Sequence, residues 1–108
     1  MDWIKVATTD DLKPGRVIQV EIDDEPVALA QTEQGEYLAT SDICSHEYVL
    51  LHDGWLEGED IECPQHGSRF DMRTGDVRDL PATQPVPIFE VKVEGDEILL
   101  RGPIEQNR

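Results

Sequence analysis

The chain has 108 residues, and its 9 Lys and Arg against 24 Asp and Glu give a formal net charge of −15. This length fits one domain with a modest core, so we do not expect a deep substrate cavity. The acidic balance argues against partners that are nucleic acids or anionic membrane surfaces, and no segment approaches the roughly 20 apolar residues of a membrane span. The first residues lack the character of a secretion signal, so we expect a cytoplasmic protein. We also expect it to be a monomer.

The N-terminal part of the chain predicts one helical turn followed by short antiparallel strands. The turn covers residues 8–12, capped by Thr8 or Thr9, and ends before Pro14-Gly15. Residues 16–22 alternate between apolar and polar side chains, which is typical of a strand. A turn at residues 23–26 leads to a returning strand at 27–30, and a break at Gln34-Gly35 precedes another strand at 36–40.

The C-terminal part predicts a closing hairpin, with strands at residues 88–93 and 97–101 around Glu94-Gly95-Asp96. No long helical periodicity is evident. We therefore expect an all-β fold, in which a small antiparallel β-sandwich or barrel carries an inserted lobe. The chain would be a single domain of residues 1–108, with a base of residues 1–40 and 87–108 and a lobe of residues 41–86.

The expected lobe contains two short motifs, Cys44-Ser45-His46 and Cys63-Pro64-Gln65-His66, separated by 16 residues. They hold both cysteines of the chain and two of its three histidines. Each motif supplies one thiolate and one imidazole, so the two loops would have to face each other to form one site. A set of two Cys and two His is what a Rieske [2Fe–2S] centre needs, with two thiolates on one iron and two imidazoles on the other.

A structural zinc site is the main alternative, because two Cys and two His are also a common tetrahedral zinc set. The spacing favours the iron–sulfur cluster, because a zinc finger places its cysteines together and its two histidines on a helix, which Pro64 and Gly67 disfavour. A disulfide between Cys44 and Cys63 is a third possibility, and it would leave His46 and His66 unexplained.

Nearly the whole chain closely resembles the Rieske ferredoxins of bacterial ring-hydroxylating oxygenase systems. The resemblance rests on Cys-x-His and Cys-x2-His followed by Gly67-Ser68, and it extends to Gly54 through Gly58, to residues 70–75 and to Pro81. It implies one [2Fe–2S] cluster of the Rieske type, bound by Cys44, His46, Cys63 and His66. We expect Trp55 and Phe70 to form the core of the lobe, Gly75 to form a turn, and Pro81 to wall the cluster.

The chain departs from the respiratory branch of this family at three positions. That branch carries a disulfide between the loops where this chain has Val49 and Gln65, and a Tyr hydroxyl where this chain has Phe70. That branch also has a Ser hydroxyl that donates toward the cluster, and Ser68 matches it. Fewer donors stabilise the added electron less, so we expect a potential toward the low end of the Rieske range.

The resemblance implies an electron-transfer role and no catalysis by the chain itself. Such a ferredoxin takes single electrons from a ferredoxin reductase and passes them to a terminal oxygenase that hydroxylates aromatic rings. The alternatives are the small Rieske subunit of an NAD(P)H nitrite reductase and a structural zinc-binding module. His52, the third histidine, precedes Asp53-Gly54 and is expected to be an exposed turn residue without function.

Overall fold

The computed structural model describes residues 2–45, 49–65, 67–79 and 84–104, and all regular structure in these ranges is strand or short 3-10 turn. A larger sheet holds β1 (Ile4–Thr8), β2 (Arg16–Ile22), β3 (Glu25–Gln31), β4 (Tyr37–Ser41), β9 (Ile88–Glu94) and β10 (Glu97–Ile104). A smaller sheet holds β5 (Trp55–Glu57), β6 (Asp60–Glu62), β7 (Arg69–Asp71) and β8 (Val77–Asp79). No helix within the described ranges is long and apolar enough to cross a membrane.

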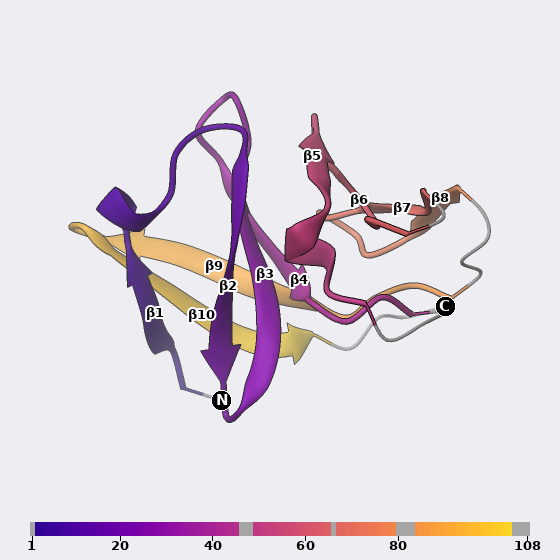
Figure 1. Ribbon diagram of the computed structural model, residues 1–108. Coiled ribbons are helices and arrows are strands. Elements are labelled where there is room, and N and C mark those ends of the chain that lie inside the picture. The colour runs from indigo at the N-terminus through magenta and orange to yellow at the C-terminus, as the bar shows by residue number, and fades with distance from the viewer. Residues whose placement is uncertain (1, 46–48, 66, 80–83, 105–108) are drawn as a thin grey trace.

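The larger sheet curls into a nearly closed antiparallel barrel, which confirms the expected fold class. Its strand order is β1-β10-β9-β4-β3-β2, and β1 and β2 at its two edges approach each other (Figure 1). Apolar side chains from several of these strands form the barrel core, with Leu29, Phe89, Ile98 and Leu100 among the buried residues. The smaller sheet, of order β5-β6-β7-β8, stands beside the barrel as a separate layer.

The expected helical turn is present as the 3-10 turn η1 (Thr9–Asp11), with Thr8 at its N-cap. The backbone N–H of Thr8 donates to the Asp11 carboxylate at 2.9 Å. The Thr8 amide lies at the start of the turn and finds no backbone acceptor within the turn, so the Asp11 carboxylate takes that role. The cap thus ends β1 and turns the chain toward β2.

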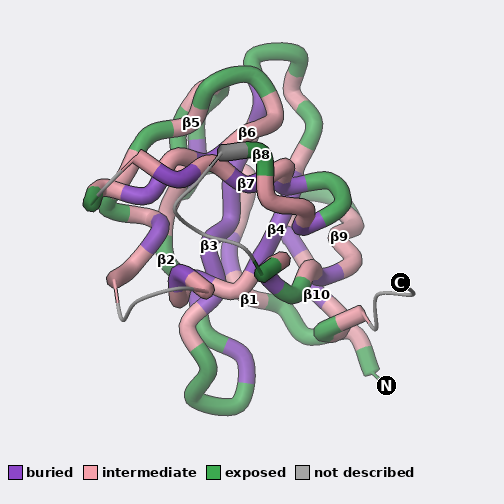
Figure 2. Tube along the Cα trace, turned by 90° about the vertical axis from the view of Figure 1, so that its right-hand side faces the viewer, coloured by how far each residue is buried: buried purple, intermediate pink, exposed green. Residues whose placement is uncertain are grey.

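Strand β3 is buried on both faces because it lies between the barrel core and the smaller sheet. Val27 and Leu29 point into the barrel core, whereas Ala28 and Ala30 belong to a second apolar cluster on the other side. The centre of the molecule around β3 and β4 is accordingly the most buried part of the trace (Figure 2). Covering on two faces explains why residues 27–30 are apolar without interruption, and the small alanines allow the second layer to approach closely.

The smaller sheet is inserted between β4 and β9, which are neighbours in the barrel. Thr40 pairs with Ile88, and the Ser41 N–H donates to the Pro87 carbonyl at 2.8 Å. The chain therefore leaves the barrel and returns to it at the same place.

One expectation about this inserted part is wrong, because Trp55 is 59% exposed and is not a core residue. In the short strand β5 the side chains alternate, and Leu56 is the one that packs against the apolar cluster. A one-residue step along a strand moves a side chain to the opposite face. Trp55 therefore faces solvent. Phe70 is fully buried, as expected.

Candidate metal centre

The first cysteine lies in a loop that the backbone closes tightly. The Cys44 N–H donates to the Val49 carbonyl at 3.0 Å, and Ile43 and Leu50 form an isolated β-bridge next to it. One step further out, the Leu51 N–H donates to the Asp42 carbonyl at 2.6 Å. These bonds fix the ends of the loop, and the Cys44 side chain is almost completely buried.

The second cysteine lies in the turn between β6 and β7. The Cys63 N–H donates to the Ser68 carbonyl at 2.7 Å, and the turn reverses at Gly67, whose φ of 73° lies in the left-handed region that glycine adopts without steric cost. Cys63 and Ser68 are both fully buried. Cys63 and Gly67 thus lie at the two sides of a short connection that the Cys63–Ser68 backbone bond closes.

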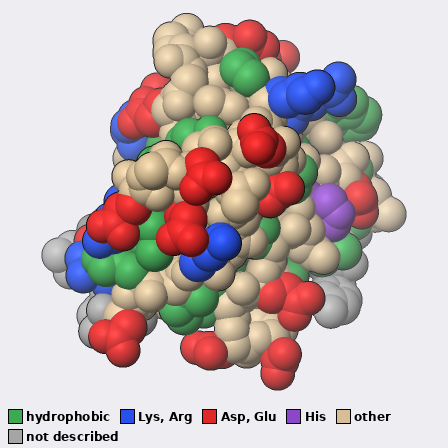
Figure 3. Space-filling view, turned by 90° about the vertical axis from the view of Figure 1, so that its left-hand side faces the viewer, with side chains coloured by type: hydrophobic (Ala, Val, Ile, Leu, Met, Phe, Trp, Pro, Cys, Tyr) green, Lys and Arg blue, Asp and Glu red, His purple; other side chains and the backbone are tan. Residues whose placement is uncertain are grey.

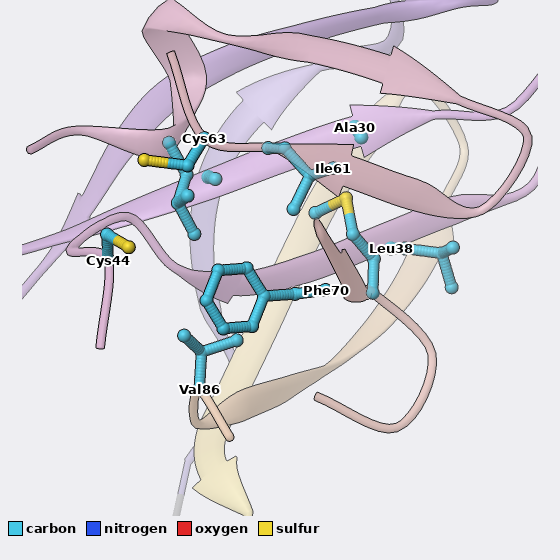
Figure 4. Packing of buried hydrophobic residues seen from close by; sticks show 10 residues of the cluster. Ala30, Leu38, Cys44, Ile61, Cys63, Phe70 and Val86 are labelled. Atoms are coloured by element: carbon cyan, nitrogen blue, oxygen red, sulfur yellow. The ribbon is translucent and has the colours of Figure 1, made fainter. Parts of the chain in front are cut away.

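The two cysteines lie at one edge of a single apolar cluster. Figure 4 shows both sulfur atoms on the same side of this cluster, with the Phe70 ring and Val86 beside them. Neither cysteine is in a disulfide, so the third possibility raised by the sequence does not apply to this structure. Two buried thiols that come from two loops and belong to one apolar cluster suit the thiolate half of a Rieske centre.

His46 and His66, the other two predicted ligands, lie outside the described residues, and so does Pro81. The structure describes the residues on both sides of His66 and the residue before His46. Ser45, next to His46, donates its hydroxyl hydrogen to the Gln84 carbonyl at 2.6 Å. That bond ties the first cysteine loop to the segment that leads back to β9.

The expectation for His52 is wrong in one respect, because its side chain is only 24% exposed and is bound to a buried carboxylate. His52 lies in the 3-10 turn η2 (Leu51–Asp53). The carboxylate of Asp42, which is fully buried, lies 2.6 Å from His52 Nδ1 and accepts the His52 backbone N–H at 2.6 Å. Gln19 of β2 donates to the same carboxylate at 2.9 Å.

The Asp42 network is not evident from the sequence, since three residues far apart in the chain form it. A buried carboxylate needs such donors, because an unpaired charge away from water is costly. The Asp42 network joins β2, the start of the Cys44 loop and η2, so that the loop is anchored to the barrel at its base.

Gly54 brings the chain after the first loop against the second loop. A Cβ atom at this position would lie 1.8 Å from the Glu62 carbonyl oxygen and 3.2 Å from Pro64 Cδ. Only a residue without a side chain fits between η2 and the turn that carries Cys63. The two loops are therefore held together by close backbone packing.

At the far end of the inserted part, Arg73 joins it to the barrel. Its guanidinium donates to Glu36, in the turn before β4, at 2.7 Å and to Glu59, in the turn between β5 and β6, at 2.6 Å. These hydrogen bonds lower the pKa of the Glu36 and Glu59 carboxyls and raise the pKa of Arg73. The three charged side chains link the two sheets across their solvent-facing edge.

Comparison with known proteins identifies the family to which this arrangement belongs. The sequence profile of the Rieske [2Fe-2S] domain matches residues 2–90. The chain belongs to the Rieske [2Fe-2S] domain family. The cofactor of this family is a [2Fe–2S] cluster of the Rieske type, and the buried pair of Cys44 and Cys63 fits its thiolate half.

Members of the Rieske family similar to this chain include ferredoxin components of dioxygenase systems. The ferredoxin component of biphenyl 2,3-dioxygenase from Rhodococcus jostii is 40% identical, over 93% of this chain and 92% of the relative. The ferredoxin of carbazole 1,9a-dioxygenase from Nocardioides aromaticivorans has a solved structure that is 38% identical, with a TM-score of 0.87, over 94% of this chain and 98% of that one.

Two further solved structures bear on the functional alternatives. A complex of reduced oxygenase and oxidised ferredoxin in carbazole 1,9a-dioxygenase contains a chain 34% identical to this one, with a TM-score of 0.87 and 97% of both chains covered. A putative small subunit of NADPH nitrite reductase is 22% identical with a TM-score of 0.79, over 94% of this chain and all of that one. This last likeness shows a shared fold alone.

Proposed function

We propose that this protein is the electron-transfer ferredoxin of a multicomponent ring-hydroxylating oxygenase system. One observation carries the proposal: the two buried cysteines come from two loops and lie at one edge of an apolar cluster, in a chain that is 40% identical to a dioxygenase ferredoxin component along nearly its whole length. The ferredoxin carries electrons, and the oxygenase it serves carries out the hydroxylation.

In this proposal Cys44, His46, Cys63 and His66 hold one [2Fe–2S] cluster, with residues 41–86 as the cluster-binding lobe and residues 1–40 and 87–108 as its base. When bound, the cluster supplies one-electron redox chemistry. The chain holds the two thiols in fixed loops, and Phe70 and Val86 exclude water from the side on which the sulfur atoms lie. Exclusion of water and a lower local dielectric tune the potential of a metal centre.

The proposed partners are a ferredoxin reductase as the electron donor and a terminal oxygenase as the acceptor. The proposal of an oxygenase partner is supported by the solved complex of an oxygenase with a ferredoxin 34% identical to this chain. We propose in addition that the protein is a monomer and works in the cytoplasm, since a shuttle has to bind one partner, leave it and reach the other.

Cluster spectroscopy on the purified protein tests this proposal. We expect a brown protein whose reduced form gives the electron paramagnetic resonance signal of a Rieske centre. Alanine in place of Cys44, His46, Cys63 or His66 should abolish stable cluster incorporation. His52→Gln is the matched control, because an amide side chain can still donate to the buried Asp42 carboxylate and His52 is not a proposed ligand; it should keep the spectrum.

Reduction by a flavin-dependent ferredoxin reductase, followed by transfer to an oxygenase, tests the role itself. A colourless protein that contains zinc would replace the proposal with a structural zinc module. A protein that is recovered only in a complex with a large nitrite-reducing partner would replace it with an enzyme subunit. A colourless His52→Gln protein that keeps its fold would make His52 a ligand and contradict the ligand set.

A further inference from the structure

A hollow of about 230 Å³ is lined by residues at the turn between β2 and β3 and by residues near the end of β10. Pro87, Phe89 and Pro103 give it apolar walls, and the exposed acidic residues Asp23 and Glu25 are among the residues that line it. Small-molecule sites usually measure about 300–1,000 Å³. A hollow of this size suits a single side chain better than a whole metabolite.

The two carboxylates of this hollow have no cationic partner within the described ranges. Neither Asp23 nor Glu25 forms an ion pair there, whereas acidic residues such as Glu36, Glu59 and Asp60 are paired with arginines. An apolar wall beneath two such carboxylates complements a side chain with an aliphatic stem and a positive head. Lysine and arginine have this construction.

A tight turn places Asp23 at the hollow. Asp23 and Asp24 form the two-residue loop between β2 and β3, and their φ angles are 50° and 68°. Aspartate adopts this left-handed region more readily than most residues other than glycine, and hairpins of this kind favour Asn or Asp at the first position. The short loop therefore fixes the backbone of Asp23 beside the hollow.

The hollow also lies close to the proposed cluster loops. Ser41 lines it and is three residues before Cys44, and Pro87 follows Val86, which packs in the same apolar cluster as both cysteines. We propose that this hollow receives an arginine side chain of the reductase that donates electrons to this chain. This inference rests on the proposed function and adds a docking point with a defined chemistry to it.

Two matched variants separate this docking point from the general acidity of the surface. Asp23→Asn combined with Glu25→Gln removes two negative charges at the hollow, and Asn tolerates the left-handed region better than most residues. Glu94→Gln combined with Asp96→Asn removes the same number of charges around the β9–β10 turn, at the opposite end of β9 from Phe89. Circular dichroism on both variants verifies that they keep the fold.

The first measurement titrates N-acetyl-arginine-methylamide into the oxidised, cluster-containing protein and follows the amide NMR signals of Glu25, Phe89 and Gly102. We expect saturable shifts of these signals. The affinity for the probe should be at least about threefold lower in the Asp23→Asn, Glu25→Gln variant (the hollow variant) and unchanged in the control variant. The uncharged citrulline analogue should shift these signals far less. Equal shifts with both probes, or equal binding by the hollow variant and the unaltered protein, would overturn the docking point.

The second measurement is the second-order rate of cluster reduction by the reductase at low salt. We expect a fall of roughly tenfold in the hollow variant and of about twofold in the control variant. Equal falls would show that bulk charge alone acts, and would overturn the docking point. If the arginine probe binds and no reductase or oxygenase exchanges electrons with the protein, the proposed function fails. If the unaltered protein exchanges electrons with its partners but does not bind the arginine probe, the docking point fails and the proposed function stands.

Discussion

Single residues decide how closely the two cysteine loops approach each other, and Gly54 is the clearest example. Its φ of −90° lies outside the left-handed region, so a positive φ is not what requires a glycine here. It is needed because the Glu62 carbonyl oxygen occupies the space of a Cβ atom. A side chain here must push η2 away from the turn that carries Cys63.

We predict that Gly54→Ala lowers the free energy of unfolding by about 3 kcal/mol, the upper end of the cost of overpacking. Gly58→Ala is the control, because Gly58 has a φ of 62° and a Cβ atom added there would meet no other atom within 4 Å. It should cost about 1 kcal/mol through its backbone angle alone. Chemical denaturation of the cluster-containing proteins measures both values. Equal costs would show that the contact with Glu62 relaxes without penalty.

At the scale of the elements, Arg73 is the charged link between the barrel and the inserted sheet. The depressed pKa values of Glu36 and Glu59 mean that the folded state binds protons on these carboxyls less readily than the unfolded state does. Their contribution to stability is therefore complete above the unfolded pKa of about 4.3 and is lost as the pH falls through the lower folded values.

We predict that Arg73→Gln lowers the melting temperature at neutral pH and that its difference from the unaltered protein shrinks as the pH falls below about 4. Lys5→Gln serves as the control, because it removes one positive charge from an exposed pair with Glu97 within the barrel. Melting curves between neutral and acidic pH make the comparison. A constant difference across that range would show that the two carboxyls titrate alike in the folded and unfolded states.

Element prediction from the sequence succeeded where strands are long enough to show a pattern. Residues 16–22 alternate roughly and residues 88–93 precede a clear turn signal, and both segments are strands with nearly these bounds. Strands β5 to β8 have three residues each, which is too short for a period of two to be recognised, so the sequence predicts the inserted sheet only as a lobe. The wrong expectation for Trp55 has the same cause, since one step in a short strand reverses the face.

In the candidate site, too, the sequence predicts the features that depend on neighbouring residues and misses those that depend on distant ones. The pairing of cysteine with histidine in each loop is a short-range pattern, and it is enough to predict a metal centre from the sequence. The network of Gln19, Asp42 and His52 depends on contacts between distant segments. No local signal marks Asp42 as a buried carboxylate, and no spacing rule connects it with Gln19.

On the scale of the whole molecule, the net charge of −15 dominates the surface. Acidic side chains are spread over the face shown in Figure 3 and outnumber the basic ones there. A field of this sign attracts positively charged surfaces over distances longer than a contact. It also keeps copies of the protein apart.

We predict that the second-order rates of electron transfer with the reductase and the oxygenase fall as ionic strength rises, because salt shortens the reach of these charges to about 8 Å at physiological strength. Stopped-flow reduction at increasing sodium chloride concentration measures the effect. The rate of a neutral, small-molecule reductant gives the baseline. Rates that do not respond to salt would leave solubility as the only role of the acidic surface.

The return of the chain to the barrel at the point where it left has a consequence for how the protein matures. Ser41 and Pro87 are joined by a backbone hydrogen bond, so all strand pairings of the barrel can form whatever the state of the segment between them. In a newly made chain without iron, the barrel would then already be folded, and only the ligand loops would still have to be ordered by the cluster. Hydrogen exchange on iron-free protein should find the amides of β2, β3 and β10 protected and those of β6 and β7 open, and insertion of the cluster should close the latter without altering the former.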